Sequence, residues 1–284
     1  MLISPFIVLF ALSYLAPLIY AAWLSLHSEQ RSGLGFGGGE TIFVGLGNYS
    51  TVLTDPAFLS SFRTLAMYFI VYVPLMTIAA LCAALLLDAA TAKLRRMFQL
   101  LIFLPHAVPG IIAALIWGYL YTPSVSPLVR TLADGGISIN FLSTEWVLPS
   151  IINIAVWEWT GYNMIILFTA LQAVNRELIE AARIDGASGW RIAWSVKAPI
   201  VRPAYAVILL FTVIGSLQLF SEPLVLRQMS TAVNSTFVPN MWAYNAAFSR
   251  DNLGEATAAA LILALLAAGL SLVVTRWSNR SSEK

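Results

Sequence analysis

Residues 64–87 read TLAMYFIVYVPLMTIAALCAALLL and contain no charged side chain. A helix of about 20 apolar residues crosses the hydrocarbon core of a bilayer, so this run predicts a transmembrane helix. The run is continuously apolar and lacks the period-two alternation of membrane barrel strands. It is one of six such runs, which are Leu2–Leu26, Thr64–Leu87, Met97–Tyr121, Trp146–Leu171, Ala204–Leu226 and Ala256–Val274.

The composition agrees with a membrane location. The chain has 284 residues, of which 59% are hydrophobic and only 11% are charged, whereas about 25% are charged in a soluble protein. A net charge of +2 is too small to indicate a nucleic-acid partner, and the lone Cys82 excludes an internal disulfide. His27 and His106 lack metal-ligand spacing, so we expect no metal site. We therefore expect an all-α polytopic protein in membrane lipid, with one domain over residues 1–284.

The basic residues are distributed unequally among the loops, and this predicts the orientation. Six spans with a cytoplasmic N-terminus place eleven basic residues on the cytoplasmic side and five outside, so both termini are expected in the cytoplasm. The cytoplasmic set is Lys93, Arg95, Arg96, Arg176, Arg183, Arg191, Lys197, Arg202, Arg276, Arg280 and Lys284, and the outer set is Arg31, Arg63, Arg130, Arg227 and Arg250.

The cytoplasmic loop at residues 172–203 is too polar to cross a membrane and has helix signals. Asn175 can cap a helix over Arg176–Asp185, and Gly186 is placed to end that helix in the left-handed conformation. Ser188 can cap a second short helix. Local physics leaves two interpretations open: a corner that enters a groove on another protein, or an ordinary surface hairpin.

The same loop carries a spacing that resembles a known motif. It reads Glu180-Ala181-Ala182, then Gly186, then nine residues, then Val196-Lys197-Ala198-Pro199. This is similar to the E-A-A motif of bacterial ABC importer permeases, E-A-A-x-x-x-G followed after nine residues by I-x-L-P. Val196 and Ala198 depart from that pattern.

The resemblance extends beyond this loop. The Ile-Asp pair before Gly186 resembles the carbohydrate-uptake branch, and Phe43–Tyr49 with Asp55-Pro56 resembles the first outer loop of maltose-type and glycerol-phosphate-type permeases. Phe103–Pro105 resembles their third span. The resemblance, closest to first-type permease subunits, implies the type I ABC importer permease fold with six transmembrane helices.

The resemblance also implies a function and partners. It implies that the chain forms half of the pathway of a carbohydrate importer in the bacterial inner membrane. The implied partners are a second permease, with which the chain forms a heterodimer, two ATPase subunits and an extracytoplasmic solute-binding protein. The chain has no G-x-x-x-x-G-K-[ST] loop, so ATP and Mg are expected on the ATPase, with no cofactor and no catalytic residue here. The implied coupling residues are Glu180, Ala181, Ala182, Asp185, Gly186, Ala187 and Ser188.

Polar residues inside the spans are the candidates for solute contact. Glu158 stands out, because a carboxylate in hydrocarbon costs several kcal/mol and should face a cavity or partner. A position in an interfacial aromatic belt and ordinary helix packing remain open for these residues. The candidates are Trp157, Glu158, Tyr162, Asn163, Gln218, Ser221 and Glu222.

Three other functions remain as alternatives. An ion-driven secondary transporter is expected to have inverted repeats and broken helices, and no repeat is evident here. An intramembrane enzyme needs clustered acids or histidines at one depth, whereas the spans offer scattered ones. An ABC permease for a non-sugar solute is the third alternative.

Overall fold

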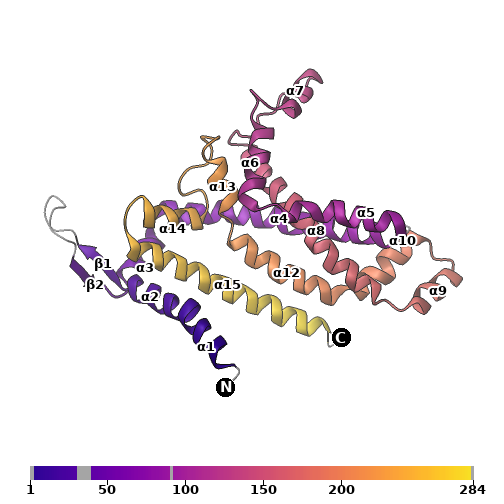
Figure 1. Cartoon of the computed structure of the whole chain (residues 1–284), viewed down its shortest axis with the longest axis horizontal. Coiled ribbons are helices and arrows are strands. Elements are labelled where there is room, and N and C mark those ends of the chain that lie inside the picture. Colours follow the sequence, from indigo (N-terminus) through magenta and orange to yellow (C-terminus); the bar gives the residue numbers. More distant parts are fainter. Residues whose placement is uncertain (1–2, 31–39, 90–91, 283–284) are drawn as a thin grey trace. The chain divides into compact units, whose positions relative to one another are not determined.

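The computed structural model (Figure 1) describes residues 3–30, 40–89 and 92–282. Its contacts divide the chain into two compact units. The first unit comprises Met1–Leu65 and Ser235–Ala268, and the second comprises Ala66–Asn234 and Gly269–Lys284. The prediction of a single domain over residues 1–284 stays a prediction. Arg31 and the glycines between residues 33 and 39 lie outside the described residues.

The predicted helical membrane fold is confirmed. The described residues include five helices long and apolar enough to cross a membrane, namely Ser4–Ser25, Pro56–Ala89, Val147–Gln172, Arg202–Leu226 and Leu253–Arg276. A bent pair, Leu94–Ala107 with Gly110–Tyr121, makes the sixth span if the pair crosses as one segment. These segments correspond to the six apolar runs of the sequence.

The first unit consists of helices and a small hairpin. Its helical elements are α1 (Ser4–Phe10), the π-helical turn η1 (Ala11–Leu15), α2 (Ala16–Ser25), α3 (Gly47–Thr54), the start of α4 (Pro56–Ala89), α14 (Pro239–Phe248) and the first part of α15 (Leu253–Ser282). Strands β1 (His27–Gln30) and β2 (Glu40–Phe43) pair antiparallel, with His27 opposite Phe43. The hairpin adds a short strand pair that was not predicted from the sequence.

The core of the first unit packs α3, α4, α14 and α15 together. Phe58 and Trp242 meet edge to face with ring centroids 5.1 Å apart, and both are fully or almost fully buried. Gly254 allows α15 to begin close to the chain at β1, because a Cβ there would lie 2.4 Å from the His27 carbonyl oxygen. The Asn48 amide donates to the carbonyls of Ser25 and His27, at 2.8 Å each.

The second unit holds the remaining elements. They are the rest of α4, α5 (Ala92–Phe103), the 3-10 turn η2 (Leu104–Ala107), α6 (Gly110–Tyr121), α7 (Pro127–Asp134), α8 (Val147–Gln172), α9 (Arg176–Ile184), α10 (Gly189–Ile192), the π-helical turn η3 (Ala193–Lys197), α11 (Ala198–Ile200), α12 (Arg202–Leu217) and α13 (Ser221–Leu226). Figure 1 shows α6 turning away from the line of α5.

The third apolar run is broken where prolines interrupt it. The two halves meet at 96°, and Val108, the residue before Pro109, is extended with φ −83° and ψ 129°. A residue before proline is disfavoured in the helical region, so the helix cannot continue through this point. Close packing holds the first half against α8, since a Cβ on Gly161 would lie 2.0 Å from the Ile102 carbonyl oxygen.

Candidate functional site

The loop with the E-A-A spacing begins with a capped helix. The Asn175 side chain accepts a hydrogen bond from the backbone N–H of Glu177 at 3.0 Å. Helix α9 then runs over Arg176–Ile184, close to the predicted range. An asparagine cap satisfies one of the free N–H groups of the first turn and stabilises a helix by about 1 kcal/mol.

Gly186 closes α9 as predicted. Its φ is +78°, in the left-handed region that glycine adopts most readily. The N–H of Ala187 donates to the Ala182 carbonyl at 2.9 Å, and the N–H of Gly186 donates to the Arg183 carbonyl at 3.0 Å. These two bonds form a Schellman motif, which fixes the direction in which the chain leaves the helix.

The second helical segment starts at the predicted cap. The Ser188 hydroxyl accepts a hydrogen bond from the backbone N–H of Arg191 at 3.3 Å. The chain continues through α10, η3 and α11 as far as Ile200, so it includes a π-helical turn that the sequence did not predict. Figure 1 shows α9 and α10 at one end of the second unit, past the end of α8.

The corner between α9 and α10 is exposed to solvent. Glu180 is exposed, and among the described ion pairs it has none with Arg176 or Arg183, although their spacing permits both. Ile184 and Trp190 flank the turn and are 86% and 75% exposed. These two residues were not among those predicted from the sequence, although both stand beside the predicted turn.

A partly buried polar cluster joins this loop to the end of α4. The Asp88 carboxylate forms an ion pair with Lys197 and accepts a hydrogen bond from the Gln172 amide at 2.8 Å. The Arg95 side chain donates to the carbonyls of Leu87 and Asp88, at 3.2 Å each. The Asp88 and Lys197 side chains are 13% and 18% exposed, so the pair is largely shielded from water and salt.

A cavity of about 350 Å³ lies inside the second unit. Its walls include six of the seven polar residues selected from the sequence, namely Glu158, Tyr162, Asn163, Gln218, Ser221 and Glu222. The seventh, Trp157, packs edge to face against Trp117, with ring centroids 5.8 Å apart. Residues from α8, α12, α13 and the break before α13 thus meet at one cavity.

The aromatic part of this cavity was not predicted. Tyr68 and Tyr72 come from α4, stack with ring centroids 4.9 Å apart, and are 3% and 5% exposed. Trp159 also lines the cavity and meets Tyr162 edge to face at 6.2 Å. Two tyrosines at helical i, i+4 spacing within an apolar run were the available signal.

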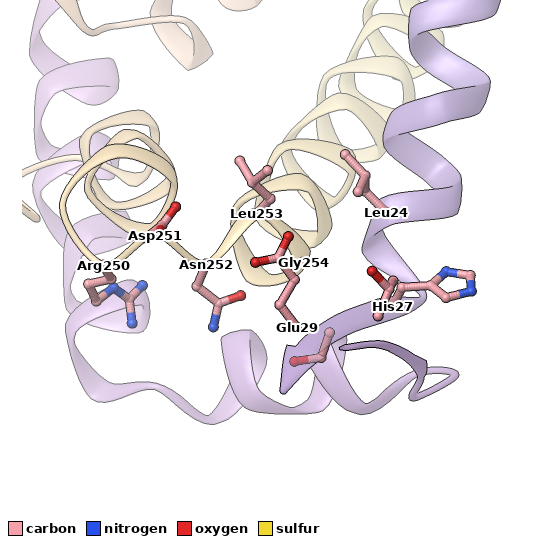
Figure 2. A pocket seen from close by; sticks show the side chains of 10 residues that line it. Leu24, His27, Glu29, Arg250, Asp251, Asn252, Leu253 and Gly254 are labelled. Atoms are coloured by element: carbon pink, nitrogen blue, oxygen red, sulfur yellow. The ribbon is translucent and has the colours of Figure 1, made fainter. Parts of the chain in front are cut away.

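A second pocket, of about 240 Å³, lies in the first unit between β1 and the start of α15 (Figure 2). Arg250 lines this pocket, and its guanidinium group stacks over the Trp242 ring, 4.4 Å from the ring centroid. Arg250 also lies 3.1 Å from the Glu255 carboxylate, an ion-pair contact without hydrogen-bond geometry. These contacts connect the end of α14 to the start of α15.

Comparison with protein families gives the class. The model of the binding-protein-dependent transport system inner membrane component matches residues 58–283. That range covers most of the chain and includes both the E-A-A corner and the cavity. The chain therefore belongs to this family of ABC importer permeases, as the resemblance implied.

Individual relatives agree. The lactose transport system permease protein LacF of Rhizobium radiobacter is 28% identical over 95% of this chain and 90% of its own length. The sn-glycerol-3-phosphate transport system permease protein UgpA of Agrobacterium fabrum is 27% identical over 99% of this chain and 94% of its own length.

A solved structure has the same fold. A chain of a bacterial alginate ABC transporter, in complex with a periplasmic protein carrying an alginate pentasaccharide, aligns with a TM-score of 0.84 at 22% identity. The alignment covers 98% of this chain and 93% of the other. The type I importer permease fold is thereby confirmed.

The family assignment does not favour the ion-gradient carrier. One feature expected of that class, a broken helix, is present between η2 and α6. The break follows from Pro109 and from the extended residue before it, so it has a local cause within the permease fold.

Proposed function

We propose that this chain is one of two permease subunits of an ATP-driven importer for a sugar or related polyol in the bacterial inner membrane. The observation that carries the proposal is the exposed E-A-A corner, which is closed by a left-handed Gly186 and projects Ile184 and Trp190 outward. A rigid turn with exposed apolar side chains suits insertion into a groove of another protein.

The coupling role belongs to the corner. Glu180, Ala181, Ala182, Asp185, Gly186, Ala187 and Ser188 would dock in a cleft of an ATPase subunit, which binds ATP and Mg. The Glu180 carboxylate has no ion pair among the described contacts and would accept from a basic or amide donor of that subunit. Such charge-assisted hydrogen bonds are strong. The Asp88–Lys197 pair would pass movement of the corner to α4.

The proposed importer also needs further partners. A second permease, forming a heterodimer, and a second ATPase would complete the complex, with a solute-binding protein docking on the extracytoplasmic loops. Phe6 and Ile19 are each 68% exposed in the first span, and such an apolar face suits lipid or the second permease. Both termini would lie in the cytoplasm.

The proposal is tested by expressing the whole operon in cells and purifying the complex from their membranes through a tag on this chain. The preparation is expected to contain a second permease and an ATPase, and to hydrolyse ATP faster when the solute-binding protein and its sugar are added. A rate of ATP hydrolysis that does not change when the binding protein is added would contradict the importer assignment.

A further inference from the structure

The cavity of the second unit has an unbalanced set of charged groups. Glu158 and Glu222 both line it, and among the described residues of its lining none is lysine, arginine or histidine. His106 packs against Trp159 and Tyr162, at 4.8 Å from each ring, without lining the cavity. Two carboxyl groups therefore face this space, and no basic side chain of the described lining faces it with them.

One of the two carboxyl groups has an unsatisfied atom. Glu158 is 7% exposed, and its Oε2 atom is buried with no hydrogen-bond partner among the described residues. Gly110 lies next to this carboxylate, because a Cβ there would lie 3.4 Å from Oε1 and 3.7 Å from Oε2. A buried acceptor without a donor costs roughly 1–3 kcal/mol, and a ligand that brings a donor recovers that free energy.

The rest of the lining suits a compound with hydroxyl groups and apolar ring faces. Gln218 supplies an amide that both donates and accepts, and Ser221 supplies a hydroxyl. Asn163 supplies an amide oxygen, since its Nδ2 already donates to the Trp159 carbonyl and to the Met76 sulfur. The stacked Tyr68 and Tyr72 supply a flat, mainly apolar wall. Small-molecule sites commonly combine aromatic walls with a few well-placed polar groups.

We propose that this cavity admits neutral, hydroxyl-rich solutes and excludes anionic ones, with Glu158 accepting a hydrogen bond from a solute hydroxyl. The proposal rests on the proposed import function and names its substrate class. Ionised carboxylates repel an anion directly. Protonated carboxyl groups leave the anion desolvated without a cationic partner, which is also unfavourable. The proposed class of solute differs from sn-glycerol-3-phosphate, for which one relative is named, and from alginate, for which the transporter of similar fold is named.

Charged thiol reagents test the exclusion directly. Cys82 is the sole cysteine, so a Cys82→Ala chain with Ser221→Cys carries one thiol at the cavity wall. The complete importer in membrane vesicles at pH 8 is treated with three methanethiosulfonates, one with a trimethylammonium group, one with a sulfonate and one neutral. Each rate is divided by that of the same reagent with 2-mercaptoethanol.

The expected result is a corrected rate for the cationic reagent about tenfold or more above that of the sulfonate, with the neutral reagent also reacting. A tenfold ratio corresponds to about 1.4 kcal/mol. Glu158→Gln and Glu222→Gln should each lower the ratio. A ratio near one, a ratio that neither variant changes, or no reaction with any reagent would overturn the proposal.

Sugar protection completes the test. Glucose should slow the reaction of the neutral reagent at Ser221→Cys, and glucuronate at equal concentration should not. Absence of protection by glucose, or equal protection by glucuronate, would overturn the proposal. ATP hydrolysis is measured in the same vesicles. Its absence would contradict the import function, whereas the ratio of reagent rates can still be measured. The two failures are therefore distinguishable.

Discussion

Among the single residues of the E-A-A corner, Glu180 offers a carboxylate that could bind another subunit. Glu180 is exposed and has no ion pair with either arginine of its own helix among the described contacts. Its removal should cost the chain little stability, since surface substitutions rarely change the free energy of unfolding by more than about 0.5 kcal/mol. Any large effect of Glu180→Ala must therefore arise in a complex with another subunit.

We predict that Glu180→Ala lowers ATP hydrolysis stimulated by the solute-binding protein roughly tenfold, because a hydrogen bond to a charged group contributes about 1.5–3 kcal/mol. Glu177→Gln, in the first turn of the same helix, serves as the matched control and should leave the rate unchanged. Equal rates for both variants and the wild type would count against contact between Glu180 and an ATPase.

At the scale of elements, the E-A-A loop is attached to the membrane helices by a shielded ion pair. Removing one partner of such a pair leaves the other charge buried and costs about 3–5 kcal/mol, whereas removing both is often nearly neutral. Asp88→Asn should therefore lower the melting temperature and speed hydrogen exchange over residues 173–200. Adding Lys197→Met should recover part of both. A double variant as unstable as Asp88→Asn alone would show that the pair does not hold the loop.

Packing between α8 and the first half of the broken span depends on one glycine. Gly161→Ala would place a Cβ 2.0 Å from the Ile102 carbonyl oxygen, and backbone cannot yield as a side chain does. We expect about 3 kcal/mol or more of destabilisation, at the upper end of overpacking effects. Gly269→Ala is the control, because it is also helical and has no atom within 4 Å of the added Cβ. Thermal unfolding in detergent of the two variants tests this, and similar melting temperatures would contradict the packing.

The elements also show what the sequence could predict. Caps at Asn175 and Ser188 and the turn at Gly186 were predictable because each depends on local hydrogen bonds and backbone conformation. The 96° break was not, although Pro105 and Pro109 marked the place. A proline predicts that a helix is interrupted, but the angle is set by packing against other helices.

The cavity was predictable only in part. Glu158 was noticeable because of the cost of a carboxylate in an apolar run. The contribution of Tyr68 and Tyr72 depends on which face of α4 meets α8 and α12, and tertiary packing decides that. Trp157 was selected beside Glu158 but lies against Trp117, since adjacent helical residues do not share a face.

For the whole chain, the charges of the loops predict the orientation in the membrane. Eleven basic residues on one side and five on the other predict cytoplasmic termini. In a Cys82→Ala background, Ser281→Cys should react with an impermeant maleimide only after the membrane is opened. Reaction in intact cells would reverse the predicted topology, and a cysteine introduced at Arg130 serves as the outer-side control.

We propose that the chain converts ATPase movement into transport through the E-A-A corner. Gly186→Ala tests it with little interference from packing, because an added Cβ meets no atom within 4 Å and the sole penalty is the left-handed φ of +78°. That penalty is roughly 1 kcal/mol. Gly189→Ala is a matched control, three residues away, also without a neighbour within 4 Å and without a positive φ.

The decisive measurement is ATP hydrolysis by the purified importer, with and without its sugar-loaded binding protein, for wild type, Gly186→Ala and Gly189→Ala at equal expression. We predict that Gly186→Ala assembles but loses most of the stimulated hydrolysis, because a shifted turn moves Trp190 on α10 relative to Glu180 and Ile184 on α9. Gly189→Ala should behave as wild type. Full stimulation in Gly186→Ala would contradict the coupling role of the corner.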